Sequence, residues 1–312
     1  MAAEATQLGK IRRLAIYLDK NADMLVSSRN ETNSHDFKML RVLKVEGLIK
    51  VKVELPSEIG NMNKDKLEVS ILDHLQTLDS LSNEYCDLKD VGRLTNLRKL
   101  RIILSSSLQN LEKILKYTCS TLNRIQSLIV KNDTNNGEEQ AMQQIVSSCR
   151  GIYKLTLDGP IAELPKELHN YPNLTKLVLW SCGLKEDQMG ILEKLPNLTN
   201  LKLFEKPFEE NTKILVFSRG GFPCLEFLHV SRMGQITELR VEKGAMPRLC
   251  QLCIQFCPGL TTLPDGLRYL IYLKELTIRW MCRELHRQIE EDGEDFYKIQ
   301  HVPSLVIGEP LD

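Results

Sequence analysis

Residues 249–264 read LCQLCIQFCPGLTTLP, and this stretch decides the fold. Its apolar side chains follow two different spacings. Leu252 and Ile254 are two residues apart, as in a strand that buries one face. Leu260, Leu263 and the apolar residues after them recur every three or four residues, which is typical of a helical or irregular turn. The stretch therefore predicts a short strand and a return turn, and such a coil is too small to bury its own apolar side.

The strand spacing LxxLxL recurs along most of the chain. Its central residue occurs eleven times at intervals of 22 to 35 residues, and only one interval is longer than 29. Intervals of roughly 20 to 29 residues are typical of leucine-rich repeats. The same repetition explains why Leu accounts for 51 of 312 residues. The eleven central residues are Leu14, Leu43, Leu78, Leu100, Leu128, Leu155, Leu177, Leu201, Leu228, Leu252 and Leu276.

This ladder predicts an α/β solenoid. It should be a leucine-rich-repeat horseshoe of about eleven repeats with a parallel β-sheet on its concave face. A single leucine-rich-repeat domain is expected over 1–312, with an entry strand and loop at 1–36 and repeats at 37–282. The polar stretch at 283–312 leaves the pattern and is expected to cap the last open core.

Some stretches interrupt the rhythm. Segments 21–35, 132–140 and 205–221 lack the repeat pattern and are expected to be loops. The 35-residue interval between Leu43 and Leu78 is too long for one repeat and too short for two. We interpret it as a degenerate repeat, and the register between these two residues stays open.

Charge and composition favour a soluble protein. Lys plus Arg and Asp plus Glu both total 41, so the formal net charge is zero and gives no reason to expect nucleic acid or an anionic membrane as partner. No segment approaches the roughly 20 apolar residues of a membrane span, and the first residues lack the apolar stretch of a signal peptide. Nine Cys, an odd number, suit a reducing compartment. A cytoplasmic location is therefore expected.

The sequence contains no recognisable enzymatic motif. The six His show neither HExxH nor paired spacing, and no Ser/His/Asp order stands out. The spacing of Cys250, Cys253 and Cys257 could suggest metal ligation. However, Cys257 belongs at an inward corner whereas Cys253 points outward, so the sulfurs should diverge. No catalytic residue, cofactor or metal site is expected.

The outward strand positions carry the candidate binding site. In LxxLxLx the third, fifth and seventh residues point away from the core. Several of them are aromatic where solvent would normally select polar residues, and two further aromatics follow one position beyond. They favour a protein partner, because Trp is enriched in interface hot spots, although flanking loops or segment 205–221 could instead cover them. The candidate residues are Lys176, Trp180, Lys202, Phe204, Phe227, His229, Phe256, Arg279 and Trp280.

Basic residues also occupy outward positions of neighbouring coils, while acidic residues gather at 205–210 and 290–295. One interpretation is a solvated surface of mixed charge. The other is a basic concave strip that attracts an acidic partner, within the molecule or outside it. The basic residues are Lys99, Arg101, Lys131, Lys154, Lys176 and Lys202.

Several local stretches carry a more specific signature than LxxLxL. They are IRRLAI at 11–16, LPSEIG at 55–60, LTNLRKL at 94–100, VEKGAMP at 241–247 and GEDFYKIQHVP at 293–303. Together they resemble the leucine-rich-repeat region of plant coiled-coil NB-ARC disease-resistance proteins. The resemblance spans nearly the whole chain, and the last two stretches are its most specific part.

The resemblance implies a role in plant innate immunity. In this family the repeat domain recognises a pathogen effector or a guarded host protein and restrains a nucleotide switch. The chain contains no GxxxxGK[ST] phosphate loop, so the NB-ARC domain carrying that switch would be an intramolecular partner outside this chain. The alternative is a repeat-only scaffold or substrate adaptor without a switch. Four glycosylation-type sequons keep an extracellular receptor domain as a lesser alternative.

Overall fold

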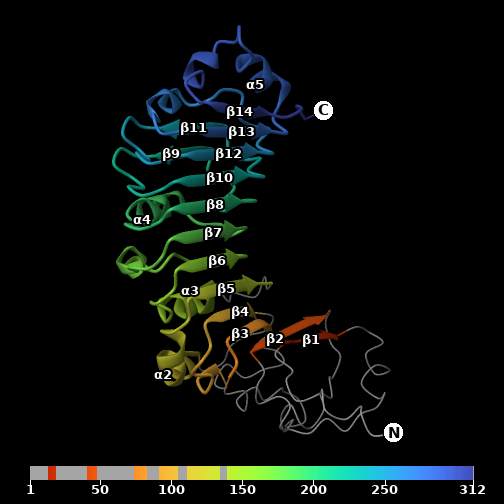
Figure 1. Cartoon of the computed structure of the whole chain (residues 1–312), viewed down its shortest axis with the longest axis vertical. Coiled ribbons are helices and arrows are strands. Elements are labelled where there is room, and N and C mark those ends of the chain that lie inside the picture. The colour runs from red at the N-terminus through yellow and green to blue at the C-terminus, as the bar shows by residue number, and fades with distance from the viewer. Residues whose placement is uncertain are drawn as a thin grey trace, which may run out of the picture. The chain divides into compact units, whose positions relative to one another are not determined.

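The structure of the chain is a computed structural model that describes residues 13–18, 41–47, 74–82, 91–104, 111–133 and 139–311. The chain falls into two compact units, residues 1–152 and 153–312. In each unit, parallel strands follow one another in chain order (Figure 1). The expectation of one domain over 1–312 stays a prediction. The expected loop at 21–35 and the LPSEIG segment of the degenerate repeat lie outside the described residues.

The first unit pairs its central leucines in one ladder, although the register shifts between Leu78 and Leu81. Leu14 pairs with Leu43, Leu43 with Leu78, Leu78 with Leu100, and Leu100 with Leu128. The described elements of this unit are β1 (Arg13–Leu18), β2 (Val42–Gly47), β3 (Thr77–Ser82), β4 (Lys99–Leu104), α2 (Leu111–Leu122), β5 (Ser127–Asn132) and α3 (Glu139–Ser147).

The expected loop at 132–140 needs correction at both ends. Asn132 is the last residue of β5, and Glu139 begins α3. The helix buries Ala141, Met142 and Ile145 on one side. This apolar spacing of three and four residues is typical of a helix that covers a core, so the repeat continues further than its leucine pattern indicates.

The second unit repeats the same register with shorter strands. Leu155 pairs with Leu177, Leu177 with Leu201, and Leu201 with Leu228. Leu228 pairs with Leu252, and Leu252 with Leu276. Its main strands are β6 (Lys154–Asp158), β7 (Lys176–Trp180), β8 (Asn200–Phe204), β10 (Phe227–Ser231), β12 (Gln251–Gln255), β13 (Glu275–Arg279) and β14 (Ser304–Ile307).

Apolar burial explains why the strands align. Leu155, Leu177 and Leu201 are fully buried, and each such Leu contributes about 1.5–3 kcal/mol relative to exposure. Cys182 and Cys257 are also buried, as expected for Cys257 at an inward corner. All eleven expected central residues lie in strands. This arrangement confirms the leucine-rich-repeat solenoid.

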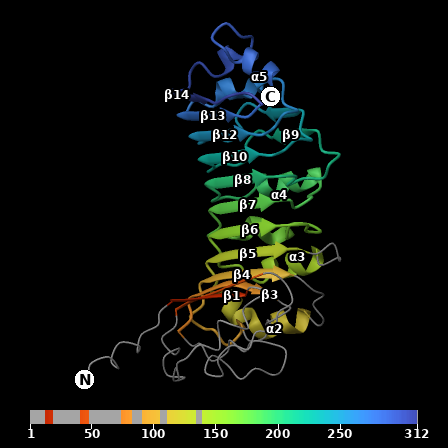
Figure 2. The same cartoon turned by 90° about the vertical axis from the view of Figure 1, so that its right-hand side faces the viewer.

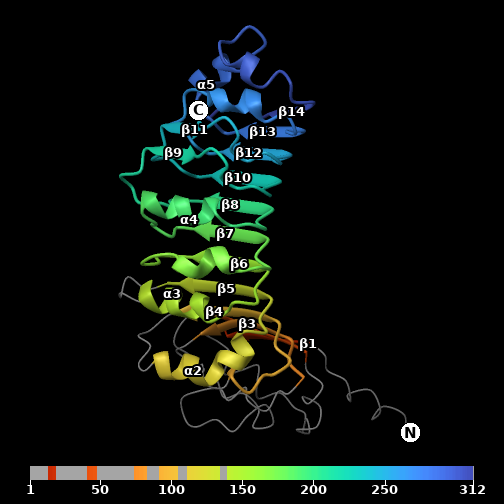
Figure 3. The ribbon, with the colours of Figure 1, turned by 90° about the vertical axis from the view of Figure 1, so that its left-hand side faces the viewer.

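Short helices lie on the side of the second unit away from its main sheet (Figures 2 and 3). They lie on the return paths of the coils that follow β6, β7, β12 and β13. They are η3 (Lys166–Asn170), η4 (Glu186–Gln188), α4 (Met189–Glu193), η5 (Asp265–Tyr269), α5 (Arg283–Gln288) and η6 (Phe296–Lys298).

Segment 205–221 is not a loop throughout, which corrects the expectation in part. It contains β9 (Ile214–Phe217), which pairs in parallel with β11 (Glu238–Val241) in a separate two-stranded sheet. Phe208, Leu215 and Phe217 are buried. Their apolar spacing does not match LxxLxL. This pattern therefore does not predict β9, which lies on the return side of the coil.

The carboxy-terminal tail does not leave the ladder entirely. Residues 304–307 form β14, and Leu305 pairs with Leu276 in the register of the preceding repeats. The polar start of the tail forms the short helix α5. The tail thus contributes a further parallel strand, while its role as a cap stays a prediction.

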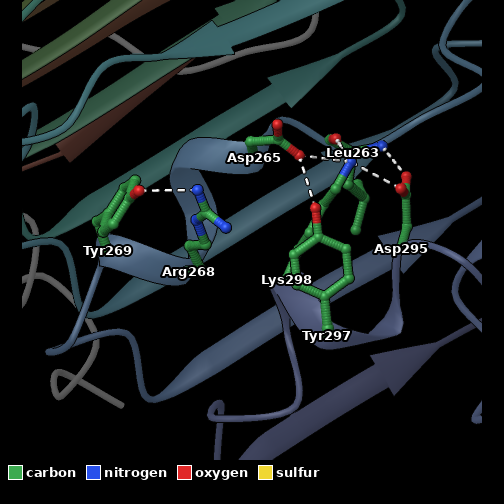
Figure 4. Close-up of polar contacts among 7 residues, drawn as sticks. All are labelled: Leu263, Asp265, Arg268, Tyr269, Asp295, Tyr297 and Lys298. Carbon is green, nitrogen blue, oxygen red and sulfur yellow. Dashed lines mark hydrogen bonds and ion pairs between the residues drawn. The ribbon is translucent and has the colours of Figure 1, made fainter.

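A buried lysine fastens this tail to the preceding coil (Figure 4). The Nζ atom of Lys298 donates to the Leu263 carbonyl at 2.7 Å and lies 2.6 Å from Asp295 and 3.0 Å from Asp265. Asp295 also accepts from the Leu263 N–H at 2.6 Å, and the Tyr297 hydroxyl donates to Asp265 at 3.0 Å. We call these five residues the tail clamp. Every buried charge in it has a partner, as burial requires.

Candidate functional site

The outward side chains of the second unit form three rows across its parallel strands. Each row collects the same position of successive strands, because the pairing register is unbroken. The first row is Lys154, Lys176, Asn200, Phe227, Gln251 and Glu275; the second is Thr156, Val178, Lys202, His229, Cys253 and Thr277; the third is Asp158, Trp180, Phe204, Ser231, Gln255 and Arg279.

The residue after each of these strands has a left-handed backbone. This conformation favours glycine, and Gly159 occupies the first such position with a φ of 101°. The later positions are Ser181, Glu205, Arg232, Phe256 and Trp280, with φ between 46° and 57°. A bulky side chain is rare in this region, and backbone strain of this kind concentrates at functional sites.

Regular hydrogen bonds hold these strained positions. The Phe256 N–H donates to the Arg279 carbonyl at 3.2 Å, and the Arg232 N–H donates to the Gln255 carbonyl at 3.0 Å. Each bond links one strand end to the last residue of the next strand. The sheet therefore fixes where the side chain after each strand emerges. It brings Phe256 and Trp280 to the same end of the strands.

Four ring-bearing residues from three neighbouring strands contact one another; we call them the Trp180 group. The Trp180 and Phe204 ring centroids are 5.2 Å apart with tilted planes. Phe204 meets His229 edge-on at 4.8 Å, and His229 meets Phe227 edge-on at 6.3 Å. Tilted and edge-on arrangements are the favourable ones for aromatic pairs.

A second cluster lies at the ends of the next two strands, β12 and β13; we call it the Phe256–Trp280 stack. The two rings are stacked with centroids 4.5 Å apart and planes 17° apart. The guanidinium of Arg232 lies 5.7 Å from the Phe256 ring centroid, within the range of a cation–π interaction.

The expectation that loops or segment 205–221 cover these rings does not hold for the two tryptophans. Trp180 is 36% exposed and Trp280 is 38% exposed. Segment 205–221 makes one polar contact here, since the Trp180 ring N–H donates to the Glu205 carboxylate at 2.7 Å. Phe204, Phe227 and Phe256 are half-buried. Solvent therefore reaches both aromatic clusters.

Cations border the aromatic rings. Lys202 Nζ lies 5.6 Å from the Phe227 ring centroid, and both Lys176 and Arg279 are exposed on the same sheet face. Burial and then the charge of Lys202 lower the pKa of His229. The buried Nε2 atom of His229 has no hydrogen-bond partner among the described residues.

The structure brings all nine sequence-predicted candidate residues to one face of the second unit. It also adds two residues that the sequence pattern does not select. Glu205 binds Trp180, and Arg232 lies over Phe256. Both directly follow a strand, at the position where the sequence analysis selected only the aromatic residues Phe256 and Trp280. Glu205 and Arg232 could have been found by examining every residue directly after the seventh position of LxxLxLx.

The expected basic residues divide between the two units. In the first unit, Arg101 lies 3.0 Å from Asp79 and Lys131 lies 2.7 Å from Asp133, so acids that the sequence argument did not consider partly neutralise them. In the second unit, Lys154 and Lys176 occupy paired positions of β6 and β7. Whether the six residues act as one strip stays a prediction.

The three clustered cysteines have different surroundings. Cys257 is buried, whereas Cys253 lies on the outward face of β12. Cys257 Sγ contacts the Gln255 carbonyl and Cys250 Sγ the Arg248 carbonyl. In the part of the chain that the structure describes, no group of three His, Cys, Asp or Glu residues is arranged to hold a metal ion.

A family model described as leucine-rich repeat region matches residues 36–298. The chain belongs to the leucine-rich-repeat family. This repeat chain is 35% identical over 252 residues to the disease resistance protein RPP8 of Arabidopsis thaliana. The matched region covers 78% of this chain and 26% of RPP8. It is 30% identical over 295 residues to the disease resistance RPP8-like protein 3 of the same plant, covering 90% and 32%. The chain thus spans about a quarter to a third of the curated relatives it matches.

Solved structures share the fold of the repeat chain. The crystal structure of the TLR13–ssRNA13 complex contains a chain that matches with a TM-score of 0.55 and 20% identity, over 95% of this chain and 44% of that one. At this identity the likeness shows the fold alone. Among the described residues of the repeat chain, no helix is both long enough and apolar enough to cross a bilayer.

Proposed function

We propose that this chain is the ligand-recognition region of a plant intracellular immune receptor of the coiled-coil NB-ARC class. Its similarity to disease resistance proteins supports the setting, and it extends over most of this chain. The resemblance to that class further suggests a cytoplasmic receptor that acts by binding and uses no cofactor. In the whole receptor the repeats would restrain a nucleotide switch located outside this chain.

One observation carries the binding assignment. Two clusters of rings, the Trp180 group and the Phe256–Trp280 stack, are solvent-accessible on the sheet face of one unit. Interface hot spots are enriched in Trp, Tyr and Arg, and such residues often anchor a partner. The sheet holds Phe256 and Trp280 in a left-handed backbone that bulky residues rarely adopt. The same turn follows the other strands of this face, so the repeat fixes where the two rings emerge.

The ligand class is a protein, either a pathogen effector or a guarded host protein. Lys176, Lys202 and Arg279 border the rings and would complement acidic groups around an apolar anchor. The partner would therefore present a large apolar side chain surrounded by carboxylates.

The test compares binding by matched variants of the whole chain. Trp180→Ala and Trp280→Ala each remove an exposed ring from the sheet face. Tyr272→Ala is the control, since Tyr272 is 58% exposed but precedes β13 instead of lying on the sheet. Quantitative affinity capture from challenged and unchallenged leaf tissue should show specific proteins lost by the two tryptophan variants and kept by the tyrosine variant. An identical set of captured proteins for all variants would contradict the assignment of this face.

A separate experiment addresses restraint of the switch. The chain would be expressed in leaf cells together with a relative's receptor from which the repeats have been removed. Reduced cell death compared with the truncated receptor alone is expected if the repeats restrain it. Unchanged cell death would contradict the restraint but leave ligand recognition standing.

A further inference from the structure

Strand β9 pairs with β11 through only one of its edges. The Lys213 carbonyl accepts from the Glu238 N–H at 3.2 Å, and the Phe217 carbonyl accepts from the Glu242 N–H at 2.9 Å. In a strand, successive residues turn their backbone groups to opposite edges. Ile214 and Val216 therefore point their N–H and C=O groups away from β11.

This second edge of β9 has no strand beside it in the described chain. Within residues 139–311, no hydrogen bond to the backbone of Ile214 or Val216 forms on this edge. The next N–H along, that of Ser218, donates to the Glu193 carboxylate at 2.5 Å. A side chain from α4 thus already satisfies one end of the edge, while the middle of the edge remains open.

The open edge lines a cavity of about 180 Å³ between β9 and the segment containing η4 and α4. Met189, Phe208 and Leu215 give it an apolar lining. Small-molecule pockets are usually about 300–1,000 Å³, so this cavity is small for a drug-sized ligand. It is better suited to part of an extended chain whose remaining residues continue across the surface.

The charged residues that line this cavity are all acidic. They are Glu186, Asp187 and Glu193, and no Lys or Arg occurs among the lining residues. Glu193 accepts from the Ser218 N–H, and Asp187 accepts from the Gln188 side chain at 3.5 Å. Glu186 and Asp187 are both exposed. The rim therefore favours a positively charged side chain.

We propose that the groove between β9 and α4 binds an extended, basic segment of a protein partner by strand addition. The backbone of the segment pairs with Ile214 and Val216, one apolar side chain enters the cavity, and a Lys or Arg faces Glu186 and Asp187. Main-chain pairing with an exposed edge is an established recognition mode, in which the pockets for alternate side chains provide specificity. This site is separate from the aromatic face and does not depend on the function proposed for that face.

The direct test uses a short capped peptide in which valine and lysine alternate, added to the full chain. Amide hydrogen exchange would be followed residue by residue by NMR. At about ten times the dissociation constant, exchange at Ile214 and Val216 should slow about tenfold, because only the unbound fraction exchanges. Absence of saturable binding, or binding without protection of these two amides, would overturn the proposal.

Val216→Pro removes the N–H that points away from β11 and leaves the hydrogen bonds to β11 in place. Proline is tolerated on an edge strand where the replaced N–H faces outward, so the variant should fold. It should weaken peptide binding about tenfold. Val216→Thr keeps the N–H and the side-chain shape and should bind almost as the parent chain does. If the proline variant does not fold, a peptide N-methylated at alternate residues removes the same bonds from the other side. Equal affinity for methylated and unmethylated peptides would exclude strand addition.

The charge requirement has its own variants. Glu186→Gln combined with Asp187→Asn should weaken the valine-lysine peptide several-fold and reduce the dependence of its binding on salt. Glu290→Gln is the control, as it removes an exposed acid in the tail. Trp180→Ala should leave peptide binding unchanged. Loss of peptide binding in the Trp180 variant would mean that the peptide occupies the aromatic face, and it would overturn the placement at β9.

Discussion

Phe256 and Trp280 stack across neighbouring coils with ring centroids 4.5 Å apart, although both have a left-handed backbone, with φ of 51° and 53°. For a non-glycine residue this conformation costs about 1–2 kcal/mol. Stacking returns about 0.5–1.5 kcal/mol beyond burial, so the pair gains little for the stability of the fold. The repeat imposes this backbone after each strand of the face, and at these two coils it directs a ring to the carboxyl end of the strands.

This balance predicts the effect of Phe256→Gly. Relief of strain should offset much of the lost stacking, and the free energy of unfolding should fall by no more than about 1–2 kcal/mol. Ile254→Ala, in the strand that directly precedes Phe256 but fully buried, should cost about 2–5 kcal/mol. Denaturant unfolding of both variants measures the difference. If Phe256→Gly cost as much as Ile254→Ala, Phe256 would be a core residue and not a strained surface residue.

The tail clamp predicts strong destabilisation by Lys298→Met. The substitution would leave the buried Asp295 carboxylate without its cation, and breaking a buried pair costs about 3–5 kcal/mol. Lys298→Met combined with Asp295→Leu removes both charges and should be less destabilised than the single variant. Thermal and denaturant unfolding provide the measurement. A double variant as unstable as the sum of the two single variants would argue against this charge pairing.

The same lysine predicts a change in alkaline stability. Burial alone would lower the pKa of Lys298, but hydrogen bonds and charges from Asp295 and Asp265 raise it overall. Its contribution is therefore complete below the unfolded pKa of about 10.4 and is lost as pH rises through the higher folded value. The stability difference between the parent chain and Lys298→Met should shrink above about pH 10.4. A difference that stays constant across this range would contradict the linkage.

His229 predicts a titration that depends on Lys202. Burial is the main cause of its lowered pKa, and the Lys202 charge is the second. Lys202→Met should therefore raise the His229 pKa, while Lys176→Met, in the neighbouring row, should change it less. NMR titration of the imidazole protons measures both values. Equal shifts in the two variants would show that the charge at Lys202 has no special effect on His229.

The cysteines predict selective labelling. Burial raises the pKa of Cys149 and of Cys182 to about 12. Because the thiolate is the reactive form, both should resist alkylation at about pH 8, whereas the half-buried Cys250 should be accessible. Mass spectrometry of native and unfolded protein, alkylated in parallel, would locate the labels. Rapid native labelling of Cys182 would mean that its coil opens readily.

Repetition is why so much of the fold could be predicted. A strand position that recurs at Leu155, Leu177 and Leu201 has to meet its copies, because each coil is covered only by its neighbours. The pattern failed where a segment uses another spacing. Phe208, Leu215 and Phe217 fill the return side and place β9 in a second sheet, whereas the sequence predicted a loop.

The candidate face was predictable for the same reason, since an alternating strand separates inward from outward residues. The contacts on that face were not predictable. Glu205 reaches Trp180 and Arg232 reaches Phe256 from positions just beyond a strand, where a left-handed turn directs the side chain. A repeat pattern predicts which strand residues point outward. It does not predict the direction that a side chain takes after a left-handed turn.

The sequence by itself determined the repeat and the outward position of the aromatic residues, because the spacing of apolar residues along a strand shows which side of it is buried. Only the tertiary structure decided that Leu305 extends the sheet, that Lys298 holds the tail, and that β9 keeps one edge open. These features depend on contacts between residues far apart in the chain, and such contacts leave no periodic signal.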